Sequence, residues 1–474
     1  MHAGRPGAIP PSRRKRQMTT AATATITRQP PGPRGHLLMG ILPDVRRDIL
    51  GCLGSLHRQY GDVVRYRLGP MRSHLVAHPD AVKHVLQDHV KNYTKDHLSY
   101  RMGAWITGNG LLTSTGDFWL RQRRLAQPAF HRQRIAGMAA GMVRQSQGML
   151  QRWELAATNG TPVGINAEMM RLTLAIVGEA LFGASVEAQA REVGAAFTVI
   201  SQQIAERFRT FRMLPPVLPT RYDRAFRDAR ATLLGIVRSI IATRREHNED
   251  HGDLLSMLML ARDEDTGEGM TDEQLGSEVM TMLLAGHETT ATSLSWAWGL
   301  LSKHPEVEAR LHAELDAVLG GRTPTAEDVP KLGYTKQVVE ETMRLYPAAV
   351  IFSRSVQEDD VIGGFRIPKG SSVDVSPYVT QRHPDFWEEP EAFRPERFAP
   401  EAAAKRHRFA YFPFSGGPRQ CIGNSFAMME AQLVLATVAQ RYRLREAPGF
   451  TLEPDSHLTL RPRGELPMYL ERRS

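Results

Sequence analysis

Apolar and polar positions follow the period of an α-helix along most of the chain. Between residues 116 and 350, apolar residues recur every three to four positions in long segments. The longest predicted helix begins at a capping box, Thr271-x-x-Gln274, and extends to about His304, where Pro305 follows. A charged stretch, Ala261–Gly269, precedes this helix and is predicted to be a loop. The pattern therefore favours a mainly α-helical protein.

Shorter segments of strand character lie toward both ends of the chain. After a helical pattern over residues 44–60, two alternating runs flank the turn Gly69-Pro70 and predict a hairpin. The predicted strands are Val63–Leu68, Ser73–Ala77, Val361–Ile367, Ser372–Val375, Leu458–Leu460 and Pro467–Leu470. No linker or internal repeat interrupts residues 36–474, so the sequence indicates one domain, mainly α with a minor β region.

The basic charge of the chain is concentrated at its N-terminus. The net charge is +9, and seven of the positive charges lie in residues 1–34, which contain no acidic residue, so the rest carries only +2. This balance argues against a nucleic-acid-binding protein. We expect residues 1–29 to form a disordered Pro- and Arg-rich tail without a transmembrane anchor, and translation could start at Met1 or Met18.

The stretch Phe414–Gly423 carries the clearest chemical signal. It reads F-S-G-G-P-R-Q-C-I-G and places Cys421 in a glycine-rich loop just before a predicted helix. Backbone N–H groups and the dipole at a helix N-terminus favour a thiolate. A buried structural cysteine is the alternative interpretation. The other cysteine, Cys52, is predicted to be a core residue, so no disulfide is expected and a reducing cytoplasm fits.

The pattern F-x-x-G-x-R-x-C-x-G resembles the haem-binding loop of the cytochrome P450 family, with every fixed position filled. The resemblance implies that Cys421 is the axial iron ligand of haem b and that Phe414, Arg419 and Gly423 also contact the haem. It covers essentially residues 30–474, beginning at the proline-rich segment Pro30–Pro33. It therefore implies the single-domain fold of a soluble, bacterial-type haem-thiolate monooxygenase.

A second motif, Ala285-Gly286-His287-Glu288-Thr289-Thr290, lies at the centre of the longest predicted helix. Gly286 is a poor helix former and the Thr289 hydroxyl can bond a preceding carbonyl, so we expect a local opening of the helix. The motif resembles the family's oxygen-activation motif, which implies haem contact by Ala285 and Gly286 and a proton relay through Glu288 and Thr289. A glycine-kinked core helix is the alternative.

Two further motifs occur in the order typical of the family. Glu341-x-x-Arg344 matches E-x-x-R, and the stretch containing Arg397 matches P-E-R-F, which together imply a buried structural cluster behind the cysteine loop. An exposed helix pair is the alternative. Trp119-x-x-x-Arg123 resembles a family helix that binds a haem propionate. Arg354, by its position, and Arg419 complete the expected propionate contacts.

The substrate pocket is expected, from position in the family, to be mostly apolar. Its predicted lining residues include Met282, Leu283, Ala349, Val350, Leu458 and Thr459. The segment Phe208–Pro216 is predicted to be an entrance loop. The sequence as a whole resembles bacterial members of the family that are related to fatty-acid hydroxylases. This resemblance suggests a fatty acid, a terpenoid or another apolar metabolite as substrate.

The predicted activity is insertion of one atom of O2 into an apolar small molecule. The resemblance implies a monomer that receives electrons from a ferredoxin or flavodoxin-type donor with its NAD(P)H reductase, because no flavin or iron–sulfur segment follows Cys421. Two alternatives stay open at this point: an H2O2-driven peroxygenase and a non-catalytic haem protein.

Overall fold

The structure is a computed structural model that describes residues 28–183, 190–210, 216, 220–247, 251–456 and 458–473. Nearly all of the tail predicted over residues 1–29 lies outside these residues, as do residues 211–215 of the predicted entrance loop Phe208–Pro216.

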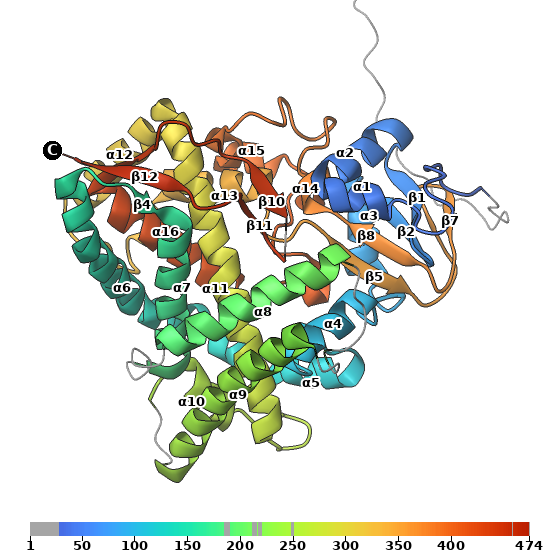
Figure 1. The fold of residues 1–474 in the computed structure, drawn as a ribbon, viewed down its shortest axis with the longest axis horizontal. Helices are drawn as coiled ribbons and strands as arrows, with labels where there is room; N and C mark the ends of the chain where they lie inside the picture. The colour runs from blue at the N-terminus through green and yellow to red at the C-terminus, as the bar shows by residue number, and fades with distance from the viewer. Residues whose placement is uncertain are drawn as a thin grey trace, which may run out of the picture.

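Helices make up most of the fold, which confirms the prediction from the apolar period (Figure 1). The predicted helix at residues 44–60 forms as two helices that Asp48 separates; its side chain accepts the Gly51 N–H and caps the second. The α-helices are α1 (Leu42–Arg47), α2 (Ile49–Tyr60), α3 (Pro79–Lys83), α4 (Leu98–Thr107), α5 (Gly116–Ala126), α6 (Arg132–Asn159), α7 (Ile165–Phe182), α8 (Ala190–Thr210), α9 (Arg221–His247), α10 (Leu254–Leu260), α11 (Asp272–Lys303), α12 (Pro305–Leu319), α13 (Gly333–Leu345), α14 (Pro377–Thr380), α15 (Pro400–Ala404) and α16 (Asn424–Ala439).

Helix α11 crosses the centre of the molecule (Figure 1). Its predicted capping box forms: Gln274 N–H donates to Thr271 Oγ1 over 3.2 Å, and Thr271 N–H donates to Gln274 Oε1 over 2.9 Å. At 1.5 Å per residue its length is about 48 Å. Most of its side chains are buried, with α7 packed along it, so α11 is the core element on which the site is built.

The strands form four small sheets. The largest has the order β1-β2-β8-β5-β3, in which only β2 and β8 run parallel. The pairing of β2 with β8 brings segments about 300 residues apart in sequence side by side (Figure 1). The strands are β1 (Val63–Leu68), β2 (Met71–Val76), β3 (Tyr93–Thr94), β4 (Val163–Gly164), β5 (Phe352–Val356), β6 (Asp360–Ile362), β7 (Phe365–Ile367), β8 (Ser372–Val375), β9 (Tyr442–Glu446), β10 (Pro454–Ser456), β11 (Leu460–Pro462) and β12 (Pro467–Arg472). The strand expected over Leu458–Leu460 begins only at Leu460, because the two preceding residues form a bend beside α11.

Short helical turns complete the chain, and one of them supports the cysteine loop. The π-helix η1 (His84–Asp88) packs against η7 (Gly417–Arg419). The other 3₁₀ turns are η2 (Gln127–Phe130), η4 (Val329–Lys331), η5 (Pro395–Phe398) and η6 (Arg408–Ala410).

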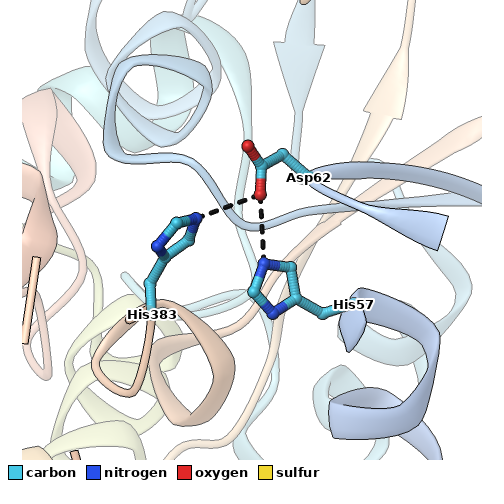
Figure 2. Close-up of side chains that lie close together, drawn as sticks. All are labelled: His57, Asp62 and His383. Atoms are coloured by element: carbon cyan, nitrogen blue, oxygen red, sulfur yellow. Dashed lines mark hydrogen bonds and ion pairs between the residues drawn. The ribbon is translucent and has the colours of Figure 1, made fainter. Parts of the chain in front are cut away.

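A histidine–aspartate clasp joins the N-terminal and C-terminal parts of the chain. His57 Nε2 and His383 Nε2 each lie 3.0 Å from the same Asp62 oxygen (Figure 2). His383 Nδ1 accepts the Asp385 N–H over 3.2 Å, so the ring proton sits on Nε2, where it is donated to Asp62. These bonds, from His383 first and His57 second, lower the pKa of Asp62. A metal ion would need the lone pair of that same nitrogen, so the geometry is that of a hydrogen-bonded clasp.

Candidate active site

Close packing shapes the loop that presents Cys421. Gly417 has φ 65°, and a side chain there would place its Cβ 2.0 Å from the Leu86 carbonyl oxygen of η1. A Cβ on Gly416 would lie 2.4 Å from the ring of Phe409. Cys421 N–H donates to Phe414 O over 3.0 Å, which closes the loop. Helix α16 then begins at Asn424, so Cys421 lies just before its first turn, as the sequence predicts.

The Cys421 thiol faces a cavity although protein atoms surround it. Burial raises the pKa of Cys421, while the Gly423 N–H and the cations of Arg123 and Lys95 act in the opposite direction. Burial thus opposes ionisation of the Cys421 thiol, against the effect of the helix N-terminus. A bound metal ion would overcome this opposition, because a coordinating thiol loses its proton.

The cavity has a volume of about 1250 Å³ and extends between the cysteine loop and α11. This volume exceeds the 300–1,000 Å³ typical of a small-molecule pocket, so it can hold more than one substrate-sized group. Predicted residues that line it are Phe414, Cys421, Gly423, Trp119, Arg123, Arg354, Arg419, Met282, Ala285, Gly286, Glu288, Thr289, Ala349, Val350, Leu458 and Thr459.

One predicted pocket residue, Leu283, does not line the cavity. Leu283 is only 3 % exposed and belongs to the hydrophobic core, whereas Met282 and Ala285 on the same helix line the cavity. Successive residues of a helix are rotated by about 100°, so neighbours of a cavity-facing residue need not face the cavity.

Helix α11 continues without interruption through the Ala285–Thr290 motif, so the expected opening of the helix is absent from this described segment. Thr289 Oγ1 does bond a preceding carbonyl, donating to Ala285 O over 2.6 Å. The glycine serves helix packing instead: a Cβ on Gly286 would lie 3.0 Å from Val177 Cγ2 on α7. Close approach of α7, and not weakness of α11, explains a glycine at this position.

Glu288 and Thr289 take different directions from α11. Thr289 is half-buried and lies on the cavity wall, next to the exposed face of Ala285. Glu288 is 3 % exposed, and its Oε1 accepts the hydroxyl of Thr459 over 2.8 Å. Its other oxygen lies 3.5 Å from the Ser201 hydroxyl. The acid and the hydroxyl of the motif therefore have different surroundings, and the acid is held by side chains from remote segments.

Four basic side chains converge near Cys421. Each donates to a neutral oxygen, and among the residues that the structure describes none of them forms an ion pair with a carboxylate. Lys95 donates to Leu112 O over 3.1 Å, Arg123 to Gln420 O over 2.9 Å, Arg354 to Tyr100 OH over 3.0 Å, and Arg419 to Ser114 O over 2.9 Å. The Arg419 guanidinium also lies 3.7 Å from the ring centre of Trp119. We call Lys95, Arg123, Arg354 and Arg419 the basic cradle.

The basic cradle is electrostatically incomplete. Burial, followed by the charges of Arg354 and Arg419, lowers the pKa of Lys95 well below its usual range. Burial and the charge of Arg354 also lower the pKa of Arg419. Like charges that are buried together disfavour one another unless an anion joins them. The cradle therefore has the electrostatic character of a binding site for a group with negative charge.

Glu341 and Arg344 form a buried ion pair close to the expected geometry. Arg344 Nε and Nη2 bind the two carboxylate oxygens of Glu341 over 2.7 and 2.8 Å, and neither side chain is exposed. The remaining N–H groups of Arg344 donate to the carbonyls of Gln381, Pro390 and Ala392. All five N–H donors of this guanidinium are thus used. Arg397 lies farther away, with Nε 3.4 Å from Glu341 Oε1.

Gln381 connects this ion pair to the cysteine loop. Its side-chain amide donates to Met343 O and Arg344 O, both over 3.0 Å, and its carbonyl accepts Phe412 N–H over 3.0 Å. Phe412 O in turn accepts Ser415 N–H inside the loop. The ion pair is therefore joined to the loop through one glutamine that the sequence analysis missed, because no motif marks it.

Comparison with known proteins decides the family. A model of the cytochrome P450 family matches residues 30–466. The chain belongs to the cytochrome P450 family. It is 40 % identical to cyclooctatin synthase of Streptomyces melanosporofaciens over 428 residues, which are 90 % of this chain and 91 % of that protein. It is 34 % identical to pentalenene oxygenase of Streptomyces avermitilis over 401 residues, covering 84 % and 86 % of the two chains.

Solved P450 structures share the fold. The crystal structure of the haem domain of cytochrome P450DA superposes with a TM-score of 0.86 at 28 % identity and covers 94 % of this chain and 98 % of that one. Retinoic-acid-bound cyanobacterial CYP120A1 gives a TM-score of 0.84 at 27 % identity, covering 94 % and 99 %. These comparisons confirm the mainly α, single-domain P450 fold predicted from the sequence.

The chain is thus a P450 monooxygenase whose cofactor is haem b. The observed site fits that group: a thiol faces a large cavity, and the basic cradle offers unmatched positive charge for its two propionates. Lys95 is the member of the cradle that the sequence analysis missed. No local signal marks it, since Lys95 directly follows β3, which pairs with β5, the strand that carries Arg354.

No α-helix in the described ranges combines the length and apolar character required to span a bilayer.

Proposed function

We propose that this P450 hydroxylates a polycyclic terpenoid or a terpene hydrocarbon with electrons from separate redox proteins. The observation that carries the proposal is the pairing of a thiol-containing, cation-rich end of the cavity with an apolar end. The names of the relatives support the substrate class: cyclooctatin synthase, cyclooctat-9-en-7-ol 5-monooxygenase and pentalenene oxygenase. Fatty acids become the less favoured class among those that the sequence left open.

The residues around the cofactor take the following proposed roles. Cys421 holds the iron, the basic cradle and Trp119 bind the propionates, and Phe414, Gly423, Ala285 and Gly286 pack against the macrocycle. Haem, when bound, supplies the binding and reductive activation of O2. The Glu341–Arg344 pair with Arg397 maintains the loop that presents Cys421.

Glu288 and Thr289 deliver the protons that O2 reduction consumes. Thr289 lies on the cavity wall. Its hydroxyl can break its hydrogen bond to the Ala285 carbonyl and donate instead to an acceptor in the cavity. Glu288, one residue earlier, is the nearest acid on α11. This pair favours a monooxygenase over a peroxygenase, because H2O2 brings its own protons.

Much of the cavity wall is apolar, although Arg46 and Arg47 of α1 also line the cavity. Its apolar wall includes Met102, Ile106, Leu111, Val177, Met282, Ala349, Val350 and Leu458. Hydroxyls on the wall already donate to protein: Thr281 to Ser277 O over 2.7 Å and Ser293 to Thr289 O over 3.0 Å. A ligand with few hydrogen-bonding groups therefore suits this apolar part of the wall.

The test is turnover with a surrogate ferredoxin, its reductase and NADPH. Tricyclic terpene hydrocarbons and their monohydroxylated derivatives should shift the optical spin state and give hydroxylated products, whereas C12–C18 fatty acids should give neither. Cys421→Ala should abolish the red-shifted Soret band of the reduced CO complex. Conversion of fatty acids alone would overturn the substrate class, and absence of any conversion across several donors would favour a non-catalytic haem protein.

A further inference from the structure

The buried acid of the oxygen motif is held by a hydroxyl from the far end of the sequence. Glu288 Oε1 accepts Thr459 Oγ1–H over 2.8 Å, although the two residues are 171 positions apart. Both side chains are buried, at 3 % and 6 % exposure. A hydrogen bond between two buried side chains fixes the carboxylate in one rotamer more firmly than a surface contact would.

The backbone directly after Thr459 is anchored by two hydrogen bonds of Leu460. Leu460 N–H donates to Ala348 O over 3.0 Å, and Leu460 O accepts the Trp296 indole N–H over 2.7 Å. Trp296 is itself buried and stacked on Tyr346, with ring centres 3.7 Å apart. Thr459 therefore reaches Glu288 from a segment that α11 and the residues after α13 hold in place.

A second hydroxyl extends the contact along α11. Thr292 Oγ1, one turn after Glu288, lies 3.4 Å from Thr459 Oγ1. A hydroxyl has one proton to donate. When Thr459 donates to an ionised Glu288, Thr292 is the donor to Thr459, and this order reverses when Glu288 carries a proton.

This reversibility distinguishes a hydroxyl from a cation as a partner. Lys or Arg at this position would stabilise only the ionised acid, whereas a threonine hydroxyl can donate to a carboxylate and accept from a carboxylic acid. A relay acid must pass through both states in each cycle. A partner that holds both states keeps the acid in position throughout the cycle.

We infer that Thr459 is a positioning residue for proton delivery: it holds Glu288 in both protonation states beside Thr289. The inference rests on the proposed monooxygenase function, in which R–H, O2, NADPH and H⁺ give R–OH, H2O and NADP⁺. Thr459, which lines the cavity wall, thereby also takes part in the chemistry of this reaction. Ser201, 3.5 Å from the other Glu288 oxygen, has a lesser part because its contact is longer.

The test compares Thr459→Val, which keeps the shape and removes the hydroxyl, with Thr459→Ser, which keeps the hydroxyl. Thr459→Val should lower the product formed per NADPH five- to tenfold and raise H2O2 release, while Thr459→Ser stays within twofold of wild type. Thr437→Val is the matched control, because it removes a buried hydroxyl that donates to Leu433 O on α16, away from the cavity. That variant should couple like wild type.

A second assay separates positioning from pocket shape. Supplied H2O2 converts R–H to R–OH and H2O without proton delivery, so Thr459→Val should match the wild-type rate in that reaction. An equal loss in both reactions would mean that Thr459 only shapes the pocket, and unchanged coupling with NADPH would overturn the inference. In Glu288→Ala, adding Thr459→Val should cause no further loss of coupling, whereas additive losses would contradict action through Glu288.

Haem content is measured for every variant. If Thr459→Val does not load haem, Thr459→Ala replaces it in both assays and in the double variant with Glu288→Ala. Failure of the wild type to convert any substrate would reject the proposed function itself. Efficient wild-type turnover with a fully coupled Thr459→Val would reject only the positioning role.

Discussion

Two groups of charges near the cysteine loop, the buried Glu341–Arg344 pair and the partly buried basic cradle, differ in one respect. The Glu341–Arg344 pair is complete, since opposite charges bind each other and every guanidinium N–H has an acceptor. The basic cradle contains four cations whose hydrogen bonds all go to neutral oxygens. The first is a structural unit that needs no ligand, and the second is stabilised only by an anion. In this molecule, a structural cluster and a binding site thus differ in whether negative charges of the protein balance the positive charges of the group.

Removing one partner of the complete pair should have the largest effect. Glu341→Ala leaves Arg344 buried without its counter-charge, which costs about 3–5 kcal/mol of the free energy of unfolding. Urea unfolding and haem content measure the loss. Glu340→Ala is the control, because Glu340 pairs with Lys336, whose side chain is 54 % exposed, and should cost under about 1 kcal/mol. Similar losses in both variants would break the comparison.

A single buried acid without a counter-charge should show the next largest effect. Burial raises the pKa of Glu278 to about 7, from 4.5 in an unfolded chain, against the bond from Leu111 N–H. The folded state therefore binds the proton more tightly, and the free energy of unfolding should fall by about 3 kcal/mol as pH rises from 4.5 to beyond 7. Melting curves across this range test the slope.

Glu278→Gln should remove this slope, because the amide keeps an acceptor for Leu111 N–H and does not ionise. The exposed Glu273→Gln on the same helix should leave the slope as in wild type. If the free energy of unfolding of Glu278→Gln depends on pH as in the wild type, another titrating group causes that dependence.

Removing the charge of one member of the basic cradle should not lower the free energy of unfolding, in contrast to Glu341→Ala. Lys95→Met removes a half-buried amine whose charged form is disfavoured by burial and by the charges of Arg354 and Arg419, so stability without haem should stay equal or increase. Haem release should become about tenfold faster, equivalent to about 1.4 kcal/mol. Transfer of haem to an excess of acceptor protein measures the rate, and the exposed Lys91→Met should not change it. A destabilised haem-free protein would show that the cradle is a structural cluster after all.

The smallest effect is expected at the edge of the complete pair. Arg397 lies 3.4 Å from Glu341 and is 11 % exposed, so Arg397→Ala leaves both buried charges paired and should cost about 1 kcal/mol. Urea unfolding measures this difference, and the exposed Arg394→Ala is the control. A loss as large as that of Glu341→Ala would mean that three charges form one unit.

The sequence by itself determined the features that depend on local spacing. Residues three apart on a helix share a face, so Glu341 and Arg344 could be paired before their surroundings were known. The capping box at Thr271 and the strands near both ends follow from the same short-range rules. The resemblance to the family rests on such motifs, because each is a short stretch of residues whose chemical roles can be inferred from their spacing.

Contacts between segments remote in sequence became known only from the tertiary structure. Lys95 joins the basic cradle through the register of β3 with β5, and Thr459 reaches Glu288 because a bend before β11 lies against α11. Gly286 reflects the approach of α7, and Leu283 turns to the core although its neighbours line the cavity. Periodicity fixes which residues of one helix share a face. Which face meets the cavity, and what meets it there, depends on how all the helices pack together.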